Sequence, residues 1–253
     1  MGFSNRFSLI KQLTITGFKL RYRGSVLGYF WSLLNPLLLL LTLYIVFALF
    51  MKINIPNYPL YLLIGILTWN FLSEGTVMSI NSMVSNRELI RKMKFPTQSI
   101  IIISCVASFV VFLINLLIFF LLMVILKVNI YFTAVVLPFY LIELFMLVLG
   151  LSLFLSALYV RYKDVIHIWN FFLLLGFWIT PIVYSTDLVP FEYLRFYMLN
   201  PLARIIVDMR GALLDNFIPT LKNIFITTII SILTFVVGYV FFKKSSKRFA
   251  EEI

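Results

Sequence analysis

The sequence KLRYRGSVLGYFWSLLNP, from Lys19 to Pro36, contains the transition on which the fold depends. Three basic residues, Lys19, Arg21 and Arg23, directly precede an apolar run that continues almost without interruption to Phe50. Anionic lipid and the insertion machinery both keep Lys and Arg on the cytoplasmic side of a membrane. The stretch therefore predicts a first membrane span whose amino-terminal end faces the cytoplasm.

The composition extends this interpretation to the whole chain. Of its 253 residues, 62% are hydrophobic and only 12% are charged, which is about half the charged share of a soluble domain. Several apolar runs approach 20 residues, and they are continuous rather than alternating, which favours spanning helices over a β-barrel. We therefore expect an all-α integral membrane protein.

The charge pattern predicts the topology. The net charge is +11, but the Lys and Arg residues lie in short clusters beside apolar runs, which favours membrane topology over nucleic-acid binding. Six spans are expected, at residues 26–51, 60–84, 98–126, 134–158, 168–184 and 221–242 of a single transmembrane domain. This arrangement places fifteen of the 21 Lys and Arg residues on the cytoplasmic side, together with both termini. Residues 1–25 are expected to form an amphipathic helix at the cytoplasmic interface.

The segment 186–215 has a different character from the spans. It is apolar but contains several charged residues, each of which would cost roughly 2.5–3.5 kcal/mol near the centre of a spanning helix. Asn200-Pro201 has the pattern of a helix cap followed by proline in the first turn. We therefore expect two short helices, at Phe191–Leu199 and Pro201–Leu214, that either dip partly into the outer leaflet or lie on it. Polar backbone ends at that depth need protein or water around them, which suggests that these helices line a pathway or cavity.

Few residues suggest catalysis. No glycine is followed by lysine, so the chain contains no P-loop. The single histidine, His167, has no ligand partner at metal-binding spacing, and Cys105 has no second cysteine with which to form an internal disulfide. Glu74 and Glu143 fall within spans, where an acid either has a function or forms an interhelical hydrogen bond, and the sequence leaves both readings open.

Two groups of residues are candidates for transport. Aromatic side chains near span ends either form an ordinary interfacial belt or line a pathway for sugars; the candidates are Tyr29, Trp31, Trp69, Phe177, Trp178 and Tyr184. Two short cytoplasmic loops, Asn86–Thr97 and Tyr159–His167, combine charged and aromatic residues. Either they are docking elements for a soluble partner, or their charges only reflect the cytoplasmic position of the loops.

Several short motifs occur together in a recognisable order. They are Arg21-Tyr22, Leu27-Gly28, Trp31 to Pro36, Phe95-Pro96, Arg161 to Asp164, Trp178 to Tyr184 and Asn200-Pro201. With this order and spacing the chain resembles the membrane subunit, or permease, of type 2 ABC polysaccharide exporters. O-antigen permeases are the most similar group, and capsule and teichoic-acid permeases are their relatives.

The resemblance implies a homodimer in the bacterial inner membrane with two copies of a separate ABC ATPase, which would bind ATP and Mg, so no cofactor is expected in this chain. It implies the export of an undecaprenyl-diphosphate-linked glycan, as in lipopolysaccharide biosynthesis, with Arg21 and Arg23 meeting the headgroup at the entry. It also implies that residues 186–215 form two re-entrant helices near the outer mouth. Certain loop residues would contact the ATPase as coupling elements: Arg87, Glu88, Arg91, Lys92, Lys94, Phe95, Arg161, Lys163 and Asp164. The alternatives are a permease for teichoic acid, capsule, or a small drug or lipid, and a membrane enzyme of glycan assembly.

Overall fold

The computed structural model describes residues 30–87, 97–246 and 249, and the regular secondary structure within these ranges is helical. In chain order the helices are α2 (Phe30–Tyr44), the π-helical η1 (Ile45–Phe50), α3 (Tyr58–Ser85), α5 (Thr97–Ile125), the 3-10 helix η2 (Phe132–Val136), α6 (Leu137–Arg161), α7 (Val165–Ile179), the 3-10 helix η3 (Thr186–Leu188), α8 (Phe191–Tyr197), α9 (Pro201–Leu214) and α10 (Leu221–Ser245). Five segments of the described chain are long and apolar enough to cross a bilayer, and α7 is a shorter apolar helix of 15 residues. The protein is therefore an all-helical, multi-pass membrane protein.

Most helices lie where the sequence predicts them, but α7 does not. Helices α3 and α5 agree with the expected ranges to within two residues, and α9 has the expected bounds. The helix expected at 168–184 instead covers Val165–Ile179, because Thr180 precedes Pro181 and adopts an extended conformation. The loop expected at 159–167 is correspondingly short, since α6 continues to Arg161 and α7 begins at Val165.

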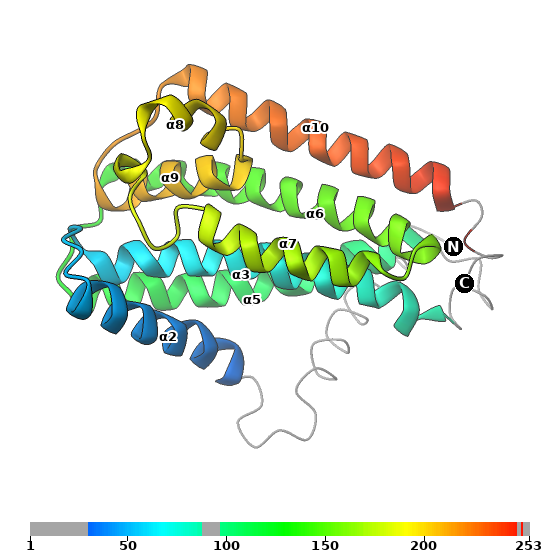
Figure 1. The fold of residues 1–253 in the computed structure, drawn as a ribbon, viewed down its shortest axis with the longest axis horizontal. Coiled ribbons are helices and arrows are strands. Elements are labelled where there is room, and N and C mark those ends of the chain that lie inside the picture. Colours follow the sequence, from blue (N-terminus) through cyan, green and yellow to red (C-terminus); the bar gives the residue numbers. More distant parts are fainter. Residues whose placement is uncertain (1–29, 88–96, 247–248, 250–253) are drawn as a thin grey trace.

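The long helices run roughly along one axis, with α3 and α6 at the centre of the bundle (Figure 1). Helix α6 packs against α10, α3 and α5, while α3 also contacts α2, α7 and α9. One end of the bundle carries the carboxyl ends of α3, α6 and α10, and we call it the basic end; its cations include Arg87, Arg161, Lys163, Lys243 and Lys244. The opposite end carries α8 and α9, and we call it the hairpin end.

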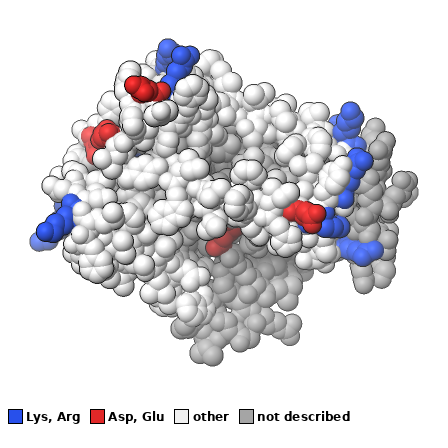
Figure 2. Space-filling view, viewed as in Figure 1, with Lys and Arg blue, Asp and Glu red and all other residues white. Residues whose placement is uncertain are grey.

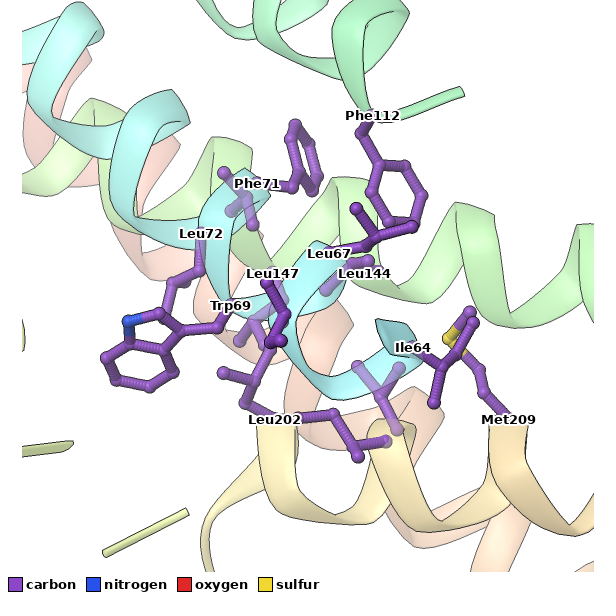
Figure 3. Packing of buried hydrophobic residues seen from close by; sticks show 14 of the residues in the cluster. Ile64, Leu67, Trp69, Phe71, Leu72, Phe112, Leu144, Leu147, Leu202 and Met209 are labelled. Carbon is purple, nitrogen blue, oxygen red and sulfur yellow. The ribbon is translucent and has the colours of Figure 1, made fainter. Parts of the chain in front are cut away.

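The apolar core reaches from the long helices into the short helix α9. Figure 3 shows Ile64 and Leu67 of α3, Leu144 of α6, and Leu202 and Met209 of α9 within one cluster of buried side chains. A helix that packs so much of its surface against the bundle is positioned by the hydrophobic contacts of its apolar face. Helix α8 differs, because its large side chains Phe191, Tyr193 and Phe196 are exposed.

Two glycines bring α6 and α10 into close contact. A Cβ atom at Gly238 would lie 2.1 Å from the carbonyl oxygen of Gly150, and one at Gly150 would lie 2.6 Å from the Cα of Phe235. Small residues allow helix backbones in membranes to approach closely, where dispersion forces replace the hydrophobic effect. The glycines therefore determine how α10 packs on α6.

Candidate functional site

The distinctive polar structure of this bundle lies at the hairpin end, where α7 stops. Thr180 turns extended after α7, and Pro181, Ile182 and Val183 follow as buried, non-helical backbone. The hydroxyl of Tyr184 donates back to the carbonyls of Trp178 and Ile179, at 3.0 and 2.9 Å, and so closes the carboxyl end of α7. Buried backbone outside a helix requires hydrogen-bond partners from elsewhere in the protein.

Side chains from α3 and α9 supply these partners. The hydroxyl of Tyr58 donates to the carbonyl of Val183 at 2.7 Å, and that of Tyr61 donates to the carbonyl of Tyr184 at 3.0 Å. Arg210 of α9 donates through Nη1 to the carbonyl of Pro181 and through Nη2 to that of Ile182, the latter at 2.8 Å. We call the segment 180–184 together with Tyr58, Tyr61, Asn200 and Arg210 the polar junction.

Arg210 is the centre of the polar junction. Its side chain is only 3% exposed, and its Nε and Nη2 also donate to the carbonyl of Tyr61 at 3.1 and 2.8 Å. The guanidinium lies 3.4 Å from the centre of the Tyr61 ring, a cation–π contact. Burial lowers the pKa of Arg210 to about 10, so the group remains charged at neutral pH. One side chain thus joins α9, α3 and the end of α7.

Gly65 provides the space for this guanidinium. A Cβ atom there would lie 2.7 Å from Nη2 of Arg210 and 3.2 Å from the Cα of Ile182. The absence of a side chain on this turn of α3 lets the arginine and the non-helical segment after α7 approach the helix backbone.

Asn200 attaches the start of α9 to the same segment. Its side-chain oxygen accepts from the backbone N–H groups of Leu202 and Ala203, at 3.0 and 3.4 Å, which confirms the cap expected at Asn200-Pro201. Its amide nitrogen donates to the hydroxyl of Thr180 at 3.2 Å. Both ends of α9 are therefore linked to the residues that follow α7.

The aromatic candidates are partly brought together. Trp69 of α3 is mostly buried, with its ring edge-on to Phe177 of α7 at 6.0 Å and covering Gly176. Phe177 in turn contacts Trp178 edge-on at 5.3 Å, and about half of Trp178 is exposed. Trp31 is 40% exposed on α2, and Tyr29 lies outside the described residues.

A hydrogen bond attaches the amino-terminal half of α7 to α3. The indole N–H of Trp169 donates to the hydroxyl of Thr76 at 2.8 Å. None of the α7 side chains is classed as buried, and Phe171, Phe172 and Leu174 of this helix are more than half exposed. Helix α7 therefore lies on the bundle surface and is held mainly at a few points.

At the basic end, the turn between α6 and α7 consists of Tyr162, Lys163 and Asp164. Arg161 lies over the ring of Tyr162 at 5.3 Å, and Lys163 lies over that of Tyr159 at 5.2 Å. Arg87 is exposed just after α3. The remaining predicted coupling residues and the predicted entry residues lie outside the described part of the chain: Glu88, Arg91, Lys92, Lys94, Phe95, Arg21 and Arg23.

Charge is distributed unevenly over the molecule. Figure 2 shows blue Lys and Arg side chains gathered at the basic end, mixed charges at the hairpin end, and a largely white surface between them. This matches a membrane-embedded middle with its excess of cations on one side.

The two intramembrane acids have different surroundings. Glu143 is 2% exposed and accepts a hydrogen bond from the hydroxyl of Thr228 of α10. An interhelical hydrogen bond was one of the two roles that the sequence allowed for this acid. Glu74 is half-buried beside a pocket of about 20 Å³ that Asn70 and Asn115 also line. That volume is sufficient for about one water molecule. Within the described residues, no group of three or more His, Cys, Asp and Glu side chains could hold a metal ion.

Sequence reasoning did not identify Arg210, which it treated only as a charge on the outer side. One signal was available: Arg210 is four residues after Ile206 and three before Leu213, so it lies on the apolar face of its helix. The tyrosines that complete the junction had no comparable local signal.

Comparisons with known proteins cover nearly the whole chain. A family model described as "ABC-2 type transporter" matches residues 8–214. Two curated proteins of Klebsiella pneumoniae, each named "O-antigen export system permease protein RfbA", are 31% and 30% identical over 247 residues, covering 97% of this chain and 95% of each relative. A protein of the same name from Myxococcus xanthus is 27% identical over 237 residues, which are 93% of this chain and 91% of that relative.

Proposed function

Because the chain belongs to the ABC-2 type transporter family, we propose that it is the membrane subunit of an exporter that moves a lipid-linked polysaccharide of O-antigen type across the bacterial inner membrane. The observation that carries this proposal is the 31% identity to an O-antigen export permease over 97% of the chain. Such similarity along the full length extends to the loops as well as the spans. Two copies of this subunit would form the pathway, and a separate ATPase would supply the energy.

The structure supports six crossings, with α7 and the segment after it forming the fifth. A helix of 15 residues is about 22 Å long, which is less than the hydrocarbon core of about 30 Å. The non-helical residues 180–184 continue the chain beyond the end of α7 toward the hairpin end. Their carbonyls accept hydrogen bonds from the polar junction, which makes non-helical backbone tolerable at that depth.

The re-entrant helices α8 and α9 would stand at the outer mouth of the pathway. An even number of crossings keeps the basic end and both termini in the cytoplasm, in agreement with the charge distribution (Figure 2). The predicted coupling elements, including Arg161, Lys163 and Asp164, then face the ATPase. Trp31, Trp178 and other predicted aromatic residues would contact the sugars.

Two measurements on the natural host test this function. Deletion of the gene should remove the surface glycan and leave its lipid-linked form inside the cell, and a plasmid copy should restore export. The tagged protein, purified in mild detergent, should retain an ATPase in equal amount. A normal surface glycan after deletion would refute the proposal, whereas an acquired drug sensitivity with normal glycan would assign the protein to a drug or lipid permease.

A further inference from the structure

A cavity of about 490 Å³ opens beside the polar junction at the hairpin end. It lies between the loop before α3, the residues that follow α7, and the carboxyl end of α9, and its lining includes Ile55, Tyr61, Asp187, Leu214 and Asp215. Small-molecule sites in proteins have volumes of about 300–1,000 Å³. The cavity is therefore large enough for an organic ligand.

The lining is rich in hydrogen-bond acceptors. Asp187 and Asp215 supply carboxylates, Asn54 an amide and Ser185 a hydroxyl. Among the described residues that line the cavity, none is a lysine or an arginine. Arg210 interacts electrostatically with Asp215, but its guanidinium is buried against the Tyr61 ring and bound to backbone carbonyls, so the two carboxylates are the charges in the lining. They disfavour a phosphate or another anionic headgroup, since like charges repel.

Apolar groups complete the lining and exclude other ligand classes. Ile53, Ile55, Leu188 and Leu214 provide aliphatic surface beside the ring of Tyr61. A bare metal ion needs oxygen ligands converging within about 2.6 Å, which a cavity of this size with such aliphatic surface does not favour. A ligand with many hydroxyl donors and apolar C–H faces matches both parts of the lining.

The polar groups are held before any ligand arrives. The hydroxyl of Ser185 donates to Oδ2 of Asp187 at 2.8 Å, and the backbone N–H of Asp187 donates back to that hydroxyl at 3.3 Å. The hydroxyl of Tyr61 is bound to the carbonyl of Tyr184, and its ring lies against Arg210. Pre-ordered side chains reduce the entropy lost on binding.

We propose that this cavity is a subsite for one neutral or amino sugar unit of the exported glycan at the outer mouth of the pathway. The proposal rests on the proposed function. A sugar held here would contact Tyr61, which belongs to the polar junction, and Ser185, which follows it directly. Binding and release of the sugar would therefore act on the contacts between α7, α3 and α9.

The test is a binding measurement on the purified complex in lipid nanodiscs. The probe is the host's own surface polysaccharide, released from its lipid by mild acid and titrated by calorimetry. The double variant Asp187→Asn with Asp215→Asn should bind at least roughly tenfold more weakly, because two charge-assisted acceptors are lost. Ile55→Trp should weaken binding by filling the cavity without any change of charge.

The control is Glu192→Gln, which removes an exposed acid of α8 that does not line the cavity. It should bind as the parent does. Unchanged affinity in both cavity variants would overturn the subsite, and so would glycan binding that disappears with excess chelator, since that would assign the carboxylates to a metal ion. If deletion of the gene abolishes export but the parent complex binds no glycan, the subsite is refuted while the proposed function stands.

Discussion

Replacement of Arg210 by methionine should release α9 from the end of α7. The change keeps a long apolar stem but removes every donor from the carbonyls of Pro181 and Ile182. Each buried carbonyl left without a donor costs about 1–3 kcal/mol, so the two together cost about 2–6 kcal/mol. Part of this destabilisation is offset, because the variant no longer bears the desolvation cost of a buried charge. We expect a net local destabilisation of about 3 kcal/mol, toward the lower part of that range.

Hydrogen–deuterium exchange in detergent measures this local effect. A destabilisation of about 3 kcal/mol corresponds to exchange about a hundredfold faster in the peptides that cover residues 180–215. Peptides from the first turns of α5, which begins at Thr97 toward the basic end, serve as an internal reference. Arg210→Lys should recover only part of the protection, since an ammonium lacks the planar fork that reaches several carbonyls at once.

Arg204→Met is the matched control on the same helix. Arg204 donates to one carbonyl, that of Met198, and is only partly buried. Its loss should therefore accelerate exchange far less. Exchange at the parent rate in Arg210→Met, or an equal effect in both variants, would refute the conclusion that Arg210 holds the junction together.

Other predictions concern the remaining parts of the bundle. Gly238→Ala should destabilise the protein by about 1–3 kcal/mol, because the added methyl group overpacks against Gly150, and the thermal midpoint of unfolding should fall. Val237 is about half exposed, so the control Val237→Ala should change the midpoint little. Equal midpoints in the two variants would contradict the close contact between α6 and α10. Burial raises the pKa of Asp208 to about 6, although the positive charge of Arg204 acts to lower it. Because the folded protein holds this acid in its protonated form more strongly than the unfolded chain does, the stability of the fold falls as pH rises from about 4 to above 6. Asp208→Asn should accordingly match the parent near pH 4 and exceed its thermal midpoint above pH 6, and a gain independent of pH would count against this cause. Asp164→Ala should lower glycan exported per ATP hydrolysed while assembly persists, because Asp164 makes no side-chain cap bond to α7; an unchanged ratio would remove this residue from the coupling role.

Much of the architecture could be predicted from local features of the sequence. The bounds of α3 and α5 follow from hydropathy, and those of α9 follow from its asparagine cap and proline. The predicted end of α7 was wrong by five residues, although Pro181 lay within the expected helix and is a residue that commonly ends one. Hydropathy extended the predicted span through Pro181, Ile182 and Val183, apolar residues that the chain instead buries as turns and bends.

The candidate site was harder to predict, because its members are far apart in the chain. The sequence identified Asn200, Trp178 and Tyr184 as parts of motifs, yet gave no reason to connect them with Tyr58 or Arg210. Glu143 was recognised as a buried acid, but its partner Thr228 is 85 residues away.

Local features of the chain are enough to show that this protein is helical and membrane-embedded, with its cations gathered on one side, because hydropathy, charge and caps act over a few neighbouring residues. The position of Arg210 depends instead on the packing of distant segments, since its carbonyl partners lie 149 residues away in Tyr61 and 28 away in Ile182. An arginine on an apolar helix face is costly unless such partners surround it, and their presence depends on packing between distant segments. The same dependence applies to the glycines of α6 and α10, whose lack of a side chain matters only because two helix backbones meet there.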